Sequence, residues 1–183
     1  LLSVLQQGVG INVIFYYSTT LWQAVGFDES DALTTSVITS VTNVVVTFIA
    51  IATVDKIGRK PLLTIGSAGM FVSLLTMAVA FSQAGGTTEN PSLPDPWGTI
   101  AVVAANVYVI SFGATWGPVV WVLLGEMFPG KIRAAGLAVA AAAQWQAFFA
   151  ISTSFPALAD LGLQFAYGLY AVIALLSFVF VRK

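Results

Sequence analysis

Long apolar stretches alternate along this chain with short polar windows, and the alternation predicts six membrane-spanning helices. Each stretch reaches the roughly 20 residues that a helix needs to cross the hydrocarbon core of a bilayer. We expect the spans near residues 1–26, 32–54, 62–83, 98–125, 134–158 and 163–181. Residues 85–96 are rich in Gly, Pro and Asn and should form a loop. A porin-like barrel is not indicated, because it would show shorter segments of alternating hydrophobicity.

Composition supports an all-α membrane protein. The chain is 58% hydrophobic and only 8% charged, whereas an ordinary soluble domain is about 25% charged. Histidine and cysteine are both absent, which removes the commonest metal ligand and general base, and any disulfide. We therefore expect no catalytic residue, no metal and no cofactor. No basic stretch suits nucleic acid.

The charged residues fall in windows that alternate in sign, and this predicts the orientation of the spans. The basic windows are 56–60, 131–133 and 182–183, and basic loops stay on the cytoplasmic side of a membrane. The loops after spans two and four and both ends of the segment should then be cytoplasmic. The chain begins with Leu1, within an apolar run, so we expect it to be a fragment of a longer protein.

Polar side chains within span one indicate a cavity. Gln6, Gln7 and Asn12 lie within two turns of a helix, followed by Tyr16. Amide groups facing lipid would lose water without gaining a partner, so they must face other helices or an aqueous space. One amide alone would indicate hydrogen bonding between helices. Three amides favour a polar cavity. In span two, Asn43 is the mid-span residue that needs an external partner.

Span four contains a predicted hinge. Pro118 removes the donor for the carbonyl of Ala114 and should kink the helix beside Gly117 and Trp121. In span five, an amide and an indole are adjacent at Gln144 and Trp145. This pair suits a sugar, because hydroxyls need groups that donate and accept, while a pyranose face stacks on an aromatic ring.

The spans lack charged residues at their centres, where proton or ion coupling usually requires them. The expected ligand is therefore neutral. An intramembrane enzyme would need a nucleophile–base pair or a metal cluster within the spans, so a binding or transport function is favoured over catalysis.

Five motifs in order resemble the C-terminal half, spans seven to twelve, of the sugar porter family of the major facilitator superfamily. They are Gln6-Gln7-x-x-Gly-x-Asn12-x-x-x-Tyr16-Tyr17, Asp55-Lys56-Ile57-Gly58-Arg59-Lys60-Pro61, Trp116-Gly117-Pro118-x-x-Trp121, Glu126-x-Phe128-Pro129-x-x-x-Arg133 and Gln144-Trp145. The resemblance covers nearly the whole chain. The third and fifth motifs look closest to the bacterial proton-linked hexose and pentose porters. The implied fold is a six-helix bundle that forms half of a twelve-helix transporter, in a plasma or bacterial inner membrane.

The resemblance also implies roles for individual residues. Those implied in sugar binding are Gln6, Gln7, Asn12, Tyr16, Asn43, Gly117, Trp121, Gln144 and Trp145. Those implied in a cytoplasmic gate of ion pairs are Asp55, Arg59, Glu126 and Arg133, with Asp55 expected to pair with Arg59 and Glu126 with Arg133. Asp55 and Glu126 are the acids on the side of the basic loops. Membrane orientation requires only Lys and Arg on that side, so topology alone does not explain these two acids. The chain departs from many relatives at Phe148, where they carry Asn.

The resemblance implies transport of a monosaccharide, a hexose or a pentose, by alternating access. Proton symport is favoured, with the coupling acid in an N-terminal six-helix half that belongs to the same or a separate chain. Three further possibilities stay open: a facilitative uniporter, a half-size transporter that dimerises, and a non-transporting sugar sensor on the same fold.

Overall fold

The computed structural model describes residues 1–16, 22–23, 26–86 and 91–183. Its helices are α1 (Leu2–Gly8), α2 (Ile11–Tyr16), α4 (Glu29–Ile57), α5 (Arg59–Ser82), α6 (Trp97–Ser111), α7 (Gly117–Met127), α8 (Arg133–Asp160) and α9 (Leu163–Arg182). A π-helical turn (Phe112–Trp116) joins α6 to α7. The loop between α5 and α6 contains a two-residue antiparallel ladder, β1 (Gly85–Gly86) with β2 (Pro91–Ser92). The all-α membrane fold expected from the sequence is confirmed.

Five helical segments in the described part of the chain are long and apolar enough to cross a membrane. They are α4, α5, the continuous run Trp97–Met127, α8 and α9. The first expected span differs, because its described part consists of the two short helices α1 and α2. Gly10, with φ of +84°, separates them. A side chain is strained in this left-handed region, so glycine permits the break. Residues 17–21 and 24–25 lie outside the described residues.

Local signals determine where α4 begins and ends. The Asp28 side chain accepts a hydrogen bond of 2.8 Å from the backbone N–H of Asp31, which caps the first turn. Gly58, with φ of +93°, ends the helix, and α5 begins at the next residue. Asp28 and Gly58 therefore turn the chain at opposite ends of one 29-residue helix.

The π-helical turn replaces the simple kink expected at Pro118. The N–H of Gly117 donates to the carbonyl of Phe112, five residues back instead of four. Pro118 then lies in the first turn of α7, where its missing N–H costs no helical hydrogen bond. Insertions of this kind are frequent at functional sites in helices.

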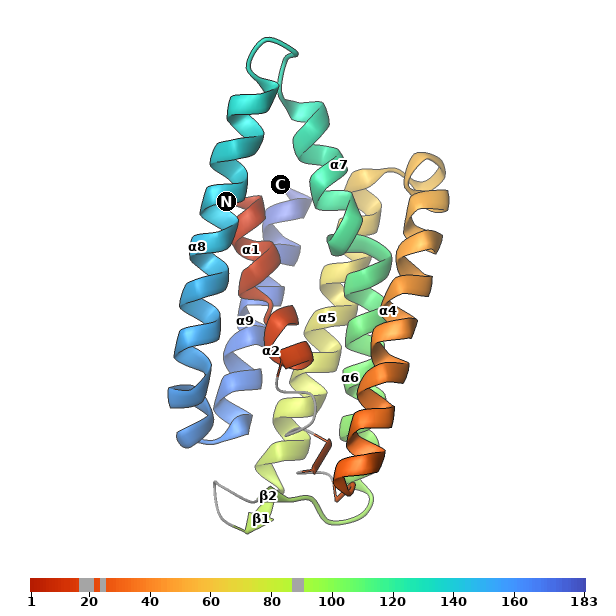
Figure 1. Cartoon of the computed structure of the whole chain (residues 1–183), viewed down its shortest axis with the longest axis vertical. Helices are drawn as coiled ribbons and strands as arrows, with labels where there is room; N and C mark the ends of the chain where they lie inside the picture. The colour runs from red at the N-terminus through yellow and green to blue at the C-terminus, as the bar shows by residue number, and fades with distance from the viewer. Residues whose placement is uncertain (17–21, 24–25, 87–90) are drawn as a thin grey trace.

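Glycines allow α5 to pack closely on the span that contains the π-helical turn. A Cβ atom at Gly66 would overlap the Thr115 side chain, and one at Gly69 would overlap Ser111 Oγ. On its other side α5 packs along α9. Small residues permit close approach of helices in lipid, where the hydrophobic effect gives little attraction between them. Helices α5 and α9 thus form the scaffold behind α1 and α2 (Figure 1).

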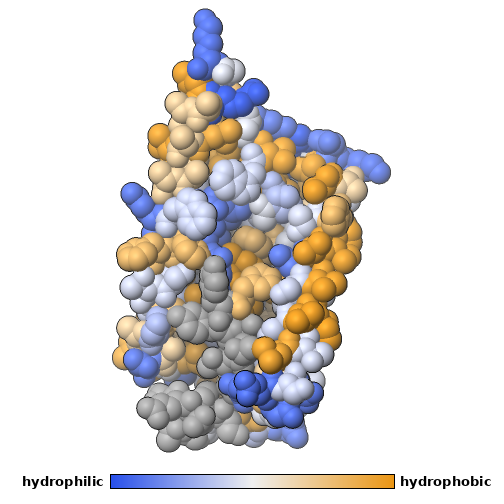
Figure 2. All heavy atoms as spheres, viewed as in Figure 1, coloured by the Kyte–Doolittle hydropathy of each residue, from blue (hydrophilic) through white to orange (hydrophobic). Residues whose placement is uncertain are grey.

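The polar connections gather at the two ends of the bundle. The α4–α5 and α7–α8 connections lie toward one end, and the β1–β2 loop and the α8–α9 turn lie toward the other (Figure 1). Figure 2 shows hydrophilic residues at both ends and along the middle of the visible face, and hydrophobic residues on the flank formed by α4. The exposed apolar residues of α4 include Val37, Val41, Val45 and Phe48. This distribution is expected for a bundle whose flanks contact lipid or other helices.

Candidate functional site

The break between α1 and α2 positions the amides of the first span. Gln7 lies in the last turn of α1 and Asn12 in the first turn of α2. Across the break, Asn12 Nδ2 donates a short hydrogen bond to Gln7 Oε1. The buried hydroxyl of Tyr108, on α6, donates to the carbonyl of Val9 at 2.7 Å. An interruption of a spanning helix is tolerated only where its freed polar groups find partners, and Tyr108 supplies one.

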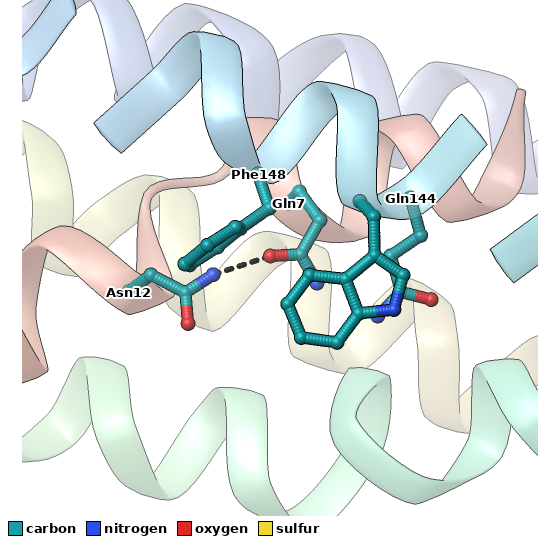
Figure 3. Close-up of a pocket in the computed structure, with 5 residues that line it drawn as sticks. Gln7, Asn12, Gln144 and Phe148 are labelled. Atoms are coloured by element: carbon teal, nitrogen blue, oxygen red, sulfur yellow. Dashed lines mark hydrogen bonds between the residues drawn. The ribbon is translucent and has the colours of Figure 1, made fainter. Parts of the chain in front are cut away.

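A pocket of about 160 Å³ lies between the broken helix and α8. It is lined by Gln7, Asn12, Gln144, Trp145 and Phe148. In Figure 3 the side chains of Gln7 and Asn12 come from the broken helix, whereas Gln144 and Phe148 project toward them from α8. The pocket therefore brings together four residues implied in sugar binding, although more than 130 positions separate the two segments.

Amide and aromatic groups give this pocket its chemistry. The Trp145 and Phe148 rings meet edge to face with their centroids 5.4 Å apart. Gln144 Oε1 is buried and, among the described residues, has no hydrogen-bond partner. Amides can donate to and accept from hydroxyls, and a ring can cover the apolar face of a sugar. A buried acceptor without a partner costs free energy until a ligand satisfies it.

Gln6 does not line this pocket but contacts the π-helical turn. Its Nε2 donates to the carbonyls of Trp116, at 2.8 Å, and Gly117, at 3.1 Å. The indole N–H of Trp116 in turn donates to the Leu63 carbonyl and to Ser67 Oγ on α5, each at 2.9 Å. Gln6 Oε1 is buried without a partner in the described structure. This network ties α1, the π-helical turn and α5 together beside the pocket.

Asn43 and Trp121, which are also implied in sugar binding, lie apart from the pocket. Asn43, on α4, faces Gly113, where an added Cβ would lie 2.5 Å from Asn43 Oδ1. That oxygen is buried and has no hydrogen-bond partner among the described residues. Trp121 is 41% exposed on α7 and lies outside the pocket. The Tyr16 side chain lies outside the described residues.

The four charged residues expected in a gate lie at the end of the bundle that contains the α4–α5 and α7–α8 connections. Arg59 binds the Glu126 carboxylate with two hydrogen bonds, Nε to Oε2 at 3.0 Å and Nη2 to Oε1 at 2.5 Å. The same Nη2 lies 2.9 Å from Asp55 Oδ1. Arg133 instead donates to the Phe128 carbonyl at 3.3 Å. The expected pair of Asp55 with Arg59 forms. Glu126, near the end of α7, pairs with Arg59 at the start of α5 and, in the described contacts, not with nearby Arg133.

The whole chain, residues 1–183, matches the family model described as "Sugar (and other) transporter". The chain belongs to the sugar porter family of the major facilitator superfamily. It is 57% identical over 98% of its length to a glucose transport protein of Synechocystis, of which it covers 39%. It is 38% identical over its full length to the D-xylose-proton symporter of Escherichia coli K12, of which it covers 36%.

Solved structures of sugar porters have the same fold. The chain superposes over its full length on a proton:xylose symporter bound to 6-bromo-6-deoxy-D-glucose, with a TM-score of 0.84 and 39% identity. It covers 38% of that chain. The chain thus spans less than two fifths of the length of each of these relatives. The protein is a multi-pass membrane protein of a family of transporters, not of enzymes.

The sequence patterns assigned no role in the site to two of its residues, Tyr108 and Phe148. Tyr108 gives no sign of its role, because its partner Val9 lies 99 residues away and is a backbone carbonyl. Phe148 stands out in the sequence only as a departure from related chains, yet it forms one wall of the pocket. Its position one turn after Gln144 on α8 is a signal of that role, since residues four apart share a helix face.

Proposed function

We propose that this chain is the C-terminal six-helix half of a monosaccharide transporter that works by alternating access. The observation that carries the proposal is the pocket between the broken helix and α8, lined by amides and aromatic rings. Among the described residues its lining has no charged side chain, which suits a neutral polyol. Names of the relatives support a hexose or a pentose, because they include a glucose transport protein and a D-xylose-proton symporter.

In the proposed mechanism, selectivity arises from hydrogen bonds inside the closed site. Gln7, Asn12 and Gln144 bind sugar hydroxyls, and Trp145 covers an apolar face of the ring. A sugar that lacks a matching hydroxyl leaves a buried amide unpaired, at a cost of about 1–3 kcal/mol. Asn43, Trp121 and Tyr16 complete the site when the second half of the transporter closes over it. Substrate sites of such folds lie near the membrane midplane, between the two halves.

The ion pairs of Arg59 with Glu126 and Asp55 form the proposed inner gate. They join the start of α5 to the end of α7, so helix separation at this end of the bundle would break the contact with Glu126. Arg133 joins the proposed gate through its hydrogen bond to the Phe128 carbonyl. This assignment follows the proposed orientation, in which the basic loops and both ends of the segment are cytoplasmic.

Proton symport is the favoured mode of transport, with the coupling acid in the N-terminal half. The described pocket lining contains no carboxylate that could carry a proton, and two of the named relatives are proton symporters. Uptake by the full-length transporter in proteoliposomes tests this proposal. Symport predicts accumulation of labelled sugar that depends on an inward proton gradient, whereas a uniporter equilibrates sugar without regard to it.

Two further measurements distinguish the proposed transporter from a sugar sensor and from a half-size transporter that dimerises. A sensor would bind sugar in calorimetry without uptake, and a half-size dimeric transporter would crosslink to a second copy in native membranes.

The site itself is tested with Gln144→Ala, which should weaken sugar affinity about tenfold through loss of one well-placed hydrogen bond. The matched control is Gln146→Ala, since Gln146 is exposed on the same helix and does not line the pocket. Unchanged affinity in the Gln144 variant would reject the proposed site.

A further inference from the structure

A second pocket, of about 390 Å³, lies at the end of the bundle that contains the α4–α5 connection. It is lined by Lys60, Pro61, Thr64, Ile65 and Arg182. The first four residues belong to the beginning of α5, and Arg182 is the last residue of α9. The pocket shares no lining residue with the sugar pocket. It lies between α5 and α9, the two scaffold helices, and no residue of the broken helix is among its described lining.

The two cations of this pocket are available to a ligand. Both are exposed, and the described residues include no acid within 4.0 Å of either one. Neighbouring Arg59 differs, because it is already paired with Asp55 and Glu126. The Arg182 guanidinium lies 5.3 Å from the centre of the Phe178 ring, a cation–π contact that orients the side chain. Lysine and arginine that converge without an acid favour an anion.

The rest of the pocket lining is apolar and continues into the membrane-spanning part of α5. Ile65 is 63% exposed, one helical turn below Pro61. A soluble phosphate would gain nothing from such a wall, whereas a lipid presents an anionic headgroup and hydrocarbon together. Basic pockets between spanning helices are the kind of site that binds anionic headgroups.

We propose that this pocket binds an anionic phospholipid, with its phosphate between Lys60 and Arg182 and an acyl chain along Ile65. Bound there, the lipid bridges the beginning of α5 to the end of α9. The proposal does not depend on sugar transport, because it requires only that the bundle lies in a membrane.

Native mass spectrometry of the full-length transporter, taken from vesicles of phosphatidylcholine with phosphatidylglycerol, tests the proposal. The wild type should retain phosphatidylglycerol preferentially. Each basic residue near an anionic lipid surface contributes roughly a fivefold gain in binding. The double variant Lys60→Gln/Arg182→Gln should therefore lose about 25-fold in phosphatidylglycerol retention. The matched control is Lys131→Gln, which removes an exposed cation from the α7–α8 connection, outside this pocket; Lys131 has no ion pair with any residue that the structure describes.

Three results would overturn the proposal. The wild type could retain the two lipids equally, or the Lys131 control could lose about fivefold, as much as the loss expected for one pocket cation, which would mean that the cations act only through general surface charge. Glycerol 1-phosphate, added as a soluble competitor, could displace the lipid at low concentration, which would show a free-phosphate site. Sugar uptake by the same vesicles is measured separately, so failure of the transport proposal would be recognised independently.

Discussion

Tyr108 donates its hydroxyl hydrogen bond to the backbone carbonyl of Val9, at the point where the first span is broken. Val9 lies between the helix that carries Gln7 and the helix that carries Asn12. Tyr108 comes from α6, one turn before the π-helical turn. The fourth span therefore helps to fix the geometry of the break, and it supports the proposed sugar pocket without lining it.

Tyr108→Phe should loosen this break. The variant leaves the Val9 carbonyl buried without its partner, which should cost about 1–3 kcal/mol of stability. Thermal unfolding of the full-length transporter measures the loss, and sugar affinity should fall with it, because Gln7 and Asn12 lose their relative placement. Tyr167→Phe is the control: Tyr167 is buried on α9, stacked on Phe81 at 5.4 Å, and outside the pocket. Wild-type affinity in the Tyr108 variant would argue against a positioning role.

Phe148→Ala should change which sugars are accepted. Removal of this ring enlarges a pocket of about 160 Å³ and takes an edge contact away from Trp145. We expect the ratio of hexose to pentose uptake to rise, because a hexose needs additional space. Phe149→Ala serves as the control, since Phe149 is 70% exposed on another face of α8. Equal changes in the uptake ratio for both variants would contradict the assignment of Phe148 to the pocket wall.

Glu126→Gln should shift the transporter toward the conformation that is open on the side of the ion pairs. The variant removes the carboxylate that accepts two hydrogen bonds from Arg59. Spin-label or fluorescence distances between the two halves measure the shift, and added salt should reduce the difference from wild type, because exposed charges are screened. Arg133→Gln should shift the distances less, since Arg133 bonds only the Phe128 carbonyl in the described contacts. A larger shift for Arg133→Gln would reverse the assigned pairing.

Gly66→Ala should destabilise the scaffold. Its Cβ would overlap Thr115 in the π-helical turn, and overpacking of this kind costs about 1–3 kcal/mol. The thermal midpoint of the full-length transporter measures this effect. Gly168→Ala, on α9, has no atom within 4 Å of the added Cβ and should leave the midpoint unchanged or raise it slightly. Equal midpoints for the two variants would show that the contact between α5 and the π-helical turn is not close-packed in the membrane.

Much of the fold was predictable because membrane burial leaves a strong signal in the sequence. Apolar stretches with polar windows between them predicted α4, α5, α8 and α9, and each helix begins and ends within a few residues of the expected span. Pro118 indicated where the fourth span would be interrupted. The sequence could not tell whether Pro118 would produce a kink or a π-helical turn, because that depends on the helices packed around it.

The candidate site was predictable in its chemistry but not in its assembly. Amides within apolar spans must avoid lipid, which indicated Gln6, Gln7 and Asn12 as cavity residues. The adjacent amide and indole of Gln144 and Trp145 were indicated by their fit to a sugar. Whether these side chains share one space depends on how α1, α2 and α8 pack, which no local pattern determines. The structure brings all of these except Gln6 together, while Asn43 and Trp121 lie elsewhere in the bundle.

The sequence by itself determined the environment of the bundle and the chemistry of its interior. Lipid surrounds the bundle, neutral polar groups lie within it, and charged residues lie at its ends. These properties follow from the cost of placing each residue type in hydrocarbon, which is a local quantity. Only the tertiary structure decided the partners, as when Glu126 bonds Arg59 of another helix instead of Arg133 seven positions along the chain. Pairing depends on the distance between helices and on side-chain direction, and both are set by packing of the whole bundle.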